Sequence, residues 1–268
     1  QEKEKNNPAM QGIMIDYKGR SEKFNAYYIP LSYLIYNKYN GRIATAVKTF
    51  EKEKGELNPE KPEDKEIIEQ FLWDSKIDRN EYTMTDIMEK GQRVNGIVTF
   101  DGVIIDGNRR AMLLNKIYNK RKDLTRCQYF LAVILPEGAD KRTILQLETE
   151  YQMGQDEKLD YNPVEKYLKC KDLVETGFKK DEIAKMMKED EAKIEEWLEV
   201  MDLMEDYLDV FGYNGIYTLL DKTEDLFLTL NKVLQRLKNI GGSSLVSWTY
   251  NALDINELKQ LAFDYIRS

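Results

Sequence analysis

The chain has 268 residues, a net charge of −8 and no histidine. The lack of histidine excludes Ser-His-Asp and Cys-His nucleophile systems and His-Glu-x-x-His zinc sites, so any catalysis must use carboxylates, Lys, Arg, Tyr or a hard cation such as Mg²⁺. No apolar run of about 18 residues is present, and two cysteines give no disulfide framework, which predicts a cytoplasmic protein without a membrane partner.

The first half of the chain predicts alternating strands and helices after a flexible polar tail at 1–10. The predicted strands are 12–15, 25–29, 97–100, 103–105 and 129–135. The predicted helices of this half are 44–58, 63–76, 83–90 and 109–120. Asp101-Gly102 between two short apolar runs is a hairpin signal.

Helical patterns dominate after residue 140. The predicted helices are 140–152, 163–176, 180–188, 191–208, 213–220, 222–239 and 254–267. This order predicts an α+β fold class, a small mixed-sheet domain followed by an all-α region. The predicted divisions after the tail are 11–152 for the mixed domain, 153–210 for a first helical domain and 211–268 for a C-terminal helical region.

The stretch from Val103 to Leu114 predicts a buried strand, a break at Asp106-Gly107 and an amphipathic helix. Two arginines in the first helical turn oppose the helix dipole and would normally be avoided there. Backbone N–H groups at that helix end, with two guanidinium groups beside them, favour an anion and above all a phosphate. The alternative is an ordinary corner with two solvated arginines.

Four stretches in order resemble the ParB/sulfiredoxin superfamily, and its ParB branch in particular. Asn37–Arg42, which ends Asn40-Gly41-Arg42, resembles a first box that ends Gln-Pro-Arg. Lys90–Val98 resembles a second box, a Gly followed by Leu-Gln-Pro-Ile and a strand. Asp106–Ala111 resembles the Gly-Glu-Arg-Arg box. Glu148–Tyr161 with Asn162-Pro163-Val164-Glu165 resembles a Glu-Asn-x-x-Arg stretch followed by Asp-Leu-Asn-Pro-Ile-Glu.

The resemblance spans about residues 28–205 and has clear departures. The prolines of the first two boxes are replaced, and Asn108 stands where ParB proteins usually carry Glu. The fourth box is longer, so Glu148 and Glu150 compete for one role. Sulfiredoxin chemistry fits poorly, because its reactive cysteine position is occupied by Asn108.

The resemblance implies a bound nucleoside triphosphate, CTP or ATP, with Mg²⁺. It implies phosphate contacts from Gly107, Asn108, Arg109 and Arg110, together with Arg42 of the first box. It implies contacts to the base or sugar from Gln92, Arg93 and Asn95. It implies a metal held by Glu148 or Glu150 with Asp106, where the two glutamates would also be the catalytic groups, and Lys158 in place of the box-four arginine. The alternatives are a solvated helix face for the glutamates and a helix N-cap for Asp106.

Residues 177–187 resemble the first helix of a DNA-binding helix-turn-helix, and Lys179, Lys180 and Lys185 are candidates for DNA backbone contacts. The following helix carries five acidic residues and one basic residue between Glu191 and Met204. Such a helix would repel phosphates, so its apolar stripe at Ile194 and Trp197 is interpreted as core.

Three functions remain open from the sequence. The first is a nucleotide-gated ParB-like switch that acts with DNA, a protein partner or a second copy of itself, with slow hydrolysis to reset it, in mobile-element partition, transcription control or antiphage defence. The second is a metal-dependent nuclease. The third is a non-catalytic adaptor that keeps the fold.

Overall fold

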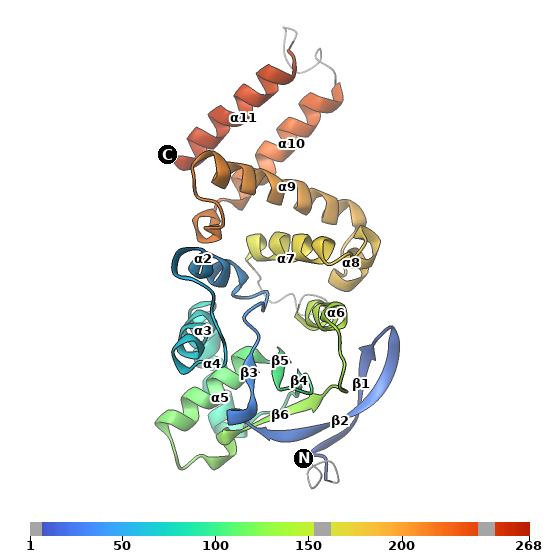
Figure 1. The fold of residues 1–268 in the computed structure, drawn as a ribbon, viewed down its shortest axis with the longest axis vertical. Helices are drawn as coiled ribbons and strands as arrows, with labels where there is room; N and C mark the ends of the chain where they lie inside the picture. Colours follow the sequence, from blue (N-terminus) through green and yellow to red (C-terminus); the bar gives the residue numbers. More distant parts are fainter. Residues whose placement is uncertain (1–6, 153–161, 241–249) are drawn as a thin grey trace.

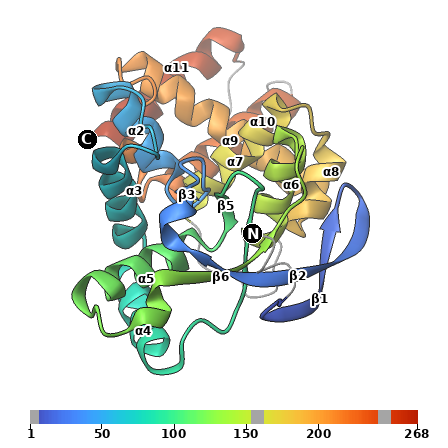
Figure 2. The ribbon, with the colours of Figure 1, turned by 60° about the horizontal axis from the view of Figure 1, so that its bottom comes forward.

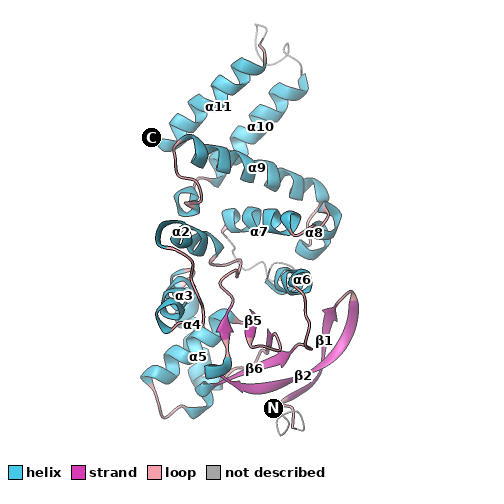
Figure 3. Cartoon of the chain, viewed as in Figure 1, coloured by secondary structure: helices cyan, strands magenta, loops and turns pink. Residues whose placement is uncertain are grey.

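The computed structural model describes residues 7–152, 162–240 and 250–268. A sheet-containing N-terminal half is followed by a helical half, which confirms the predicted α+β class (Figure 1, Figure 3). A search of the described ranges finds no helix that is long and apolar enough to cross a membrane.

The strands of the described ranges form one mixed sheet. They are β1 (Met10–Tyr17), β2 (Arg20–Pro30), β3 (Ile35–Tyr36), β4 (Gly96–Val98), β5 (Val103–Asp106) and β6 (Tyr129–Ile134). Their order across the sheet is β1-β2-β6-β4-β5-β3. β2 pairs antiparallel with β1 and β6, and β4 pairs antiparallel with β5. The β4–β6 and β3–β5 pairs are parallel. Crossover connections must therefore bring the chain back to the end of the sheet at which the first strand of each pair begins.

Helices cover both faces of this sheet. Those of the N-terminal half are α2 (Ala44–Lys54), α3 (Pro62–Asp74), α4 (Ile77–Lys90), α5 (Asn108–Lys120) and α6 (Lys141–Gln152), with short 3-10 turns η1 (Leu31–Tyr33) and η2 (Thr125–Gln128). Alternate residues of β6 point to opposite faces. Phe130 packs in a core with residues of α2 to α5, whereas Leu131 packs with Leu147 of α6. Figure 2 shows α4 and α5 on one side of β6 and α6 on the other.

The helical half has its own core. Its elements are α7 (Pro163–Glu175), α8 (Lys180–Met187), α9 (Glu191–Val210), η3 (Tyr217–Leu220), α10 (Glu224–Ile240) and α11 (Ala252–Arg267). Ile194, Trp197 and Met201 are buried in this core, so the interpretation of the α9 apolar stripe is confirmed. Ala44 of α2 belongs to the same cluster and joins the two halves.

Several predicted boundaries are wrong. The helix predicted at 213–220 is only the turn η3, because Gly212 and Gly215 adopt positive φ angles that interrupt a helix. The helix predicted from residue 83 already begins at Ile77. Met10, assigned to the tail, starts β1. Lys158 and the middle of the fourth box lie outside the described residues.

Candidate functional site

The turn between β5 and α5 is shaped by Gly107. This residue adopts φ 100°, in the left-handed region, and is the N-cap of α5 without a side-chain cap. A Cβ at this position would lie 2.6 Å from Cζ of Phe130, closer than side chains tolerate. The turn therefore requires glycine, and it leaves the first N–H groups of α5 without intrahelical partners.

A pocket of approximately 790 Å³ opens at this turn. Its lining comes from β1, the loop after β3, α4, the loop between α4 and β4, the β5–α5 turn, the first turns of α5 and the end of α6. The lining residues are Ile13, Met14, Asn40, Arg42, Arg79, Tyr82, Thr83, Val94, Asn95, Asp106, Gly107, Asn108, Arg109, Arg110, Leu113, Tyr151 and Gln152. Pockets for small molecules usually have about 300–1,000 Å³. The turn predicted from sequence as an anion site therefore borders a pocket of ligand size.

Four arginines lie in this lining, and we call it the arginine pocket: Arg42, Arg79, Arg109 and Arg110. Among the described residues that line it, Asp106 alone carries a carboxylate. The pocket is thus a basic concavity on a chain whose net charge is −8. Such a local concentration of positive charge favours an anionic ligand over the rest of the surface.

Arg109 is held by a buried amide. Its Nε donates a hydrogen bond to Oδ1 of Asn80 at 2.8 Å. Asn80 is fully buried, and its Nδ2 donates to the carbonyl oxygens of Leu72 and Trp73. An arginine oriented in this way loses less side-chain entropy when it binds a phosphate.

Arg110 bonds the β5–α5 turn to the loop before β4. It donates hydrogen bonds to the carbonyl oxygens of Val94 (2.6 Å) and Asn95 (3.0 Å), and it forms an ion pair with Asp106. Asp106 therefore neutralises Arg110 and does not cap α5, whose N-cap is Gly107. Of the two arginines in the first turn, Arg109 is the better candidate for a direct phosphate contact.

Asn108 is 2% exposed and links two loops. Its Oδ1 accepts a hydrogen bond from the backbone N–H of Asn37 at 3.0 Å, and its Nδ2 donates to the carbonyl of Ile104 at 3.0 Å. Asn108 thus links the loop after β3 to the turn between β5 and α5. Its side chain is engaged in this structural link.

Of the residues predicted to contact a base or sugar, the structure brings only Asn95 to the pocket. Gln92 exchanges hydrogen bonds with the backbone of Leu131 on β6, at 2.8 Å each. Arg93 is exposed and forms an ion pair with Asp86 at 2.9 Å. Neither Gln92 nor Arg93 lines the arginine pocket.

The three carboxylates predicted to hold a metal are in different places. Glu148 is 1% exposed, forms an ion pair with Lys169 at 3.0 Å and accepts the N–H of Gly41 at 3.1 Å. Burial raises the pKa of the Glu148 carboxyl, and the charge of Lys169 opposes that shift. Glu150 is half-buried and accepts a hydrogen bond from Gln146. Asp106 is paired with Arg110, as described above.

These donor groups do not fit a shared Mg²⁺. Each of the three carboxylates has a partner of its own, and a search of the described residues finds no cluster of three or more acidic or cysteine side chains that could hold a metal. The solvated-face alternative for Glu148 is also wrong, because its carboxylate lies in a buried ion pair.

The lysines proposed for DNA contact lie at the start of α8 and on its outer face. Lys180 forms an ion pair with Glu195 of α9 at 2.7 Å, and Lys185 lies 3.7 Å from Asp181. The backbone N–H of Lys179 donates to Glu182 at 2.8 Å. Two of the three ammonium groups therefore face a carboxylate.

Sequence reasoning missed Arg79 and Tyr82 on α4 and Tyr151 on α6, which all line the pocket. Arg79, Tyr82 and Thr83 share one face of α4 at helical spacing. That signal was hidden because the helix was predicted to begin at 83 and not at 77. Tyr151 directly follows the acidic residues on which the fourth-box resemblance rests.

No model of a protein family matches the chain, and no curated protein has a similar sequence.

Proposed function

We propose that the chain binds a nucleoside triphosphate, CTP or ATP, in the arginine pocket and acts as a ParB-like switch. The observation that carries the proposal is the concentration of four arginines in a pocket of approximately 790 Å³ at the N-terminus of α5. Phosphate oxygens carry the opposite charge to guanidinium groups and accept their paired hydrogen bonds, and the helix N-terminus adds backbone N–H donors.

The remaining lining suits the rest of a nucleotide. Tyr82 is 78% exposed and Tyr151 is half-buried, so both present aromatic surface to a base. Asn40, Asn95 and Thr83 supply neutral hydrogen-bonding groups around the same space. A base can stack on an aromatic ring, and amides can bond its edge.

Helix α6 connects the arginine pocket with the helical half, and this connection supports the proposed switch. Tyr151 and Gln152 of α6 line the pocket, and Glu148 of the same helix is ion-paired with Lys169 of α7. A ligand that contacts the end of α6 therefore acts on an element bonded to the helical half. That half is where a second copy, a protein partner or DNA would respond.

The proposal does not include a metal held by the protein. Asp106, Glu148 and Glu150 each have another partner, and they do not form a shared cluster that could hold Mg²⁺. Among the described residues, this arrangement of carboxylates gives no support to the alternative of a metal-dependent nuclease. The adaptor function remains as the outcome if no nucleotide binds.

Calorimetric titration of CTP, ATP, GTP and UTP, with and without Mg²⁺, tests this function. We expect saturable binding of one nucleotide, and we expect Arg109→Ala to weaken it by about 10- to 100-fold, the effect of losing one charge-assisted hydrogen bond. The matched control is Arg93→Ala, which removes an exposed arginine outside the pocket and should leave the affinity unchanged.

Two results would count against the proposal. Absence of binding for all four nucleotides would leave the adaptor function. Binding that survives Arg109→Ala but is lost in Arg93→Ala would place the nucleotide elsewhere on the surface.

A further inference from the structure

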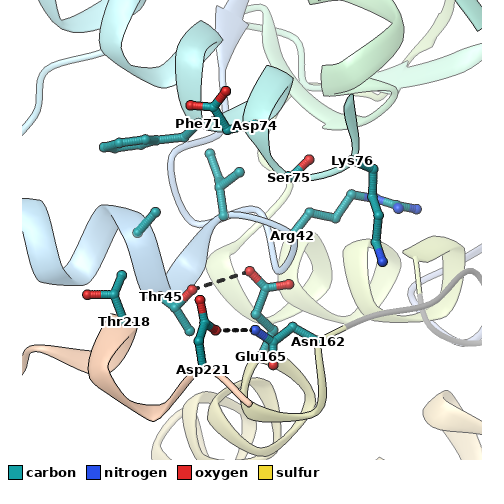
Figure 4. Close-up of a pocket in the computed structure, with 12 residues that line it drawn as sticks. Arg42, Thr45, Phe71, Asp74, Ser75, Lys76, Asn162, Glu165, Thr218 and Asp221 are labelled. Atoms are coloured by element: carbon teal, nitrogen blue, oxygen red, sulfur yellow. Dashed lines mark hydrogen bonds between the residues drawn. The ribbon is translucent and has the colours of Figure 1, made fainter. Parts of the chain in front are cut away.

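A second pocket lies between the two halves of the chain. It has a volume of approximately 340 Å³ and lies between α2, the end of α3, the start of α7 and η3 (Figure 4). We call it the Glu165 pocket. Its lining residues are Arg42, Ile43, Thr45, Ala46, Phe71, Asp74, Ser75, Lys76, Asn162, Glu165, Thr218 and Asp221.

Glu165 of α7 is an under-bonded acid in this pocket. The residue is 6% exposed, and the hydrogen bond that the described residues give its carboxyl comes from Oγ1 of Thr45 at a long 3.5 Å. Figure 4 shows the Glu165 carboxyl pointing into the pocket beside Thr45 and Asp221. A buried carboxylate with so little hydrogen bonding is costly, so its charge must be balanced by other groups or removed by protonation.

Charged side chains of both signs lie among the described residues that line the pocket around Glu165. Arg42 and Lys76 are positive, whereas Asp221 and the exposed Asp74 are negative. Burial raises the pKa of Glu165 to about 8. The charge of Arg42 is the strongest opposing influence on this pKa, Asp221 raises it further, and Thr45 and Lys76 lower it.

Arg42 is the residue that the two linings share. It follows Asn40 and Gly41 in a loop whose backbone is fixed, because the N–H of Arg42 donates to Oδ1 of Asn40 at 3.0 Å and the N–H of Gly41 to Glu148 at 3.1 Å. The long side chain of Arg42 therefore extends from a fixed base at the boundary of both pockets. In Figure 4 it runs away from Glu165 in the direction of Lys76.

We propose that nucleotide binding in the arginine pocket draws the Arg42 guanidinium toward the phosphates, and that the buried Glu165 carboxyl responds by taking up a proton from the solvent. This inference rests on the proposed nucleotide function. It adds a coupling between that site and the junction of the two halves of the chain.

The direction of the coupling follows from charge. Movement of Arg42 toward the phosphates and the arrival of negative charge both disfavour the Glu165 carboxylate, so both raise its pKa above its value in the free protein. The bound state therefore holds more protons than the free state at pH 8 to 9. By linkage, nucleotide affinity falls as the pH rises through this interval.

Calorimetry of the nucleotide at pH 8.5, in two buffers of different ionisation enthalpy, measures the proton uptake. If binding raises the pKa of Glu165 by one unit from its value of about 8, we expect an uptake of roughly half a proton per bound nucleotide at pH 8.5. The nucleotide itself is fully ionised at this pH. Glu165→Gln should bind the nucleotide as tightly as the wild type at pH 7, where Glu165 is mostly protonated, but without the proton uptake at pH 8.5.

Asp74→Asn is the matched control, because it makes the same carboxyl-to-amide change at an exposed position of the same pocket. It should retain the proton uptake. Far-UV circular dichroism and a thermal melt establish that each variant is folded. Arg42→Gln is a second variant that should reduce both affinity and proton uptake.

The outcomes separate the two proposals. Nucleotide binding without proton uptake, or uptake that persists unchanged in Glu165→Gln, would overturn the coupling between Glu165 and the nucleotide while leaving the nucleotide function intact. Failure of every nucleotide to bind the wild type would overturn the proposed function, and this inference with it.

Discussion

The β5–α5 turn depends on the absence of a side chain at residue 107. Gly107→Ala would place a Cβ at φ 100° and 2.6 Å from Phe130, a fully buried ring. We expect a loss of about 2–4 kcal/mol in the free energy of unfolding, from backbone strain together with overpacking. Urea denaturation followed by circular dichroism measures it.

The matched control is Gly138→Ala. Gly138 has φ 81° but its added Cβ would meet nothing within 4 Å. Its cost should therefore be limited to backbone strain, about 1 kcal/mol. Equal losses for the two variants would show that contact with Phe130 does not constrain the turn.

At the same scale, the arginine pocket shows why residue types alone do not define a site. Arg109 and Arg110 are adjacent in the sequence, but Arg109 is oriented by Asn80 at the pocket, whereas Arg110 is bonded to the loop at Val94 and Asn95. Asn108 lies between them and is turned into the interior. The local pattern predicted an anion site at this turn, and the structure places a pocket there, but the different hydrogen-bond partners of the two arginines lie far away in the chain.

At the scale of elements, the buried pair of Glu148 and Lys169 links α6 to α7. Their side chains are 1% and 2% exposed. We expect Glu148→Ala to lower the free energy of unfolding by about 3–5 kcal/mol, because it leaves the Lys169 ammonium buried without a counter-charge. Chemical denaturation at pH 7 measures the loss.

The double variant Glu148→Leu with Lys169→Met controls for this loss. It replaces both charges by apolar groups of similar size, so we expect it to recover most of the stability. If the double variant is as unstable as Glu148→Ala, the hydrogen bond from Gly41 to Glu148, and not the unpaired charge, is the main contribution.

Elements with a clear hydrophobic period were predictable, including the buried strand β6 and the helices α5 and α7. Elements that form only because they pair with a segment far away in the chain were not predictable. β3 has two residues and exists because it pairs with β5, a relation that no local pattern contains. The first turns of α4 were missed because Ile77 to Tyr82 is mostly polar and exposed, and with them Arg79 of the pocket.

The role of Glu148 was unpredictable for a similar reason. As part of an acidic stretch it suggested a metal ligand or a solvated face, and its burial follows only from Lys169 on another helix and Gly41 in a distant loop. Glu165 was noticed as the end of the fourth box, but nothing local indicates that its carboxyl enters a pocket that α2 and η3 help to form.

At the scale of the whole molecule, the distribution of charge limits the affinity of the helical half for DNA. The chain carries a net charge of −8. Lys180 is ion-paired with Glu195 of α9, and the pKa of Lys180 is raised by its hydrogen bond to that glutamate. The surface of α8 and α9 thus presents carboxylates together with its lysines. Phosphate binding there would have to break existing ion pairs and overcome repulsion.

We therefore expect binding of a random 20-base-pair duplex to be no tighter than about 10⁻⁴ M at physiological salt, the weak end of non-specific affinities. Lys180→Ala should change this affinity by less than about twofold, because an exposed ion pair contributes little and its loss frees Glu195 to repel DNA as well. Fluorescence anisotropy across a series of salt concentrations, with and without nucleotide, measures both quantities.

The control is Lys90→Ala, which removes a lysine paired with Asp86 in the sheet-containing half. Tight binding with a steep salt dependence that is lost in Lys180→Ala but retained in Lys90→Ala would identify α8 as a DNA-binding surface. Tight binding only in the presence of nucleotide would show that the switch changes which charges the helical half exposes.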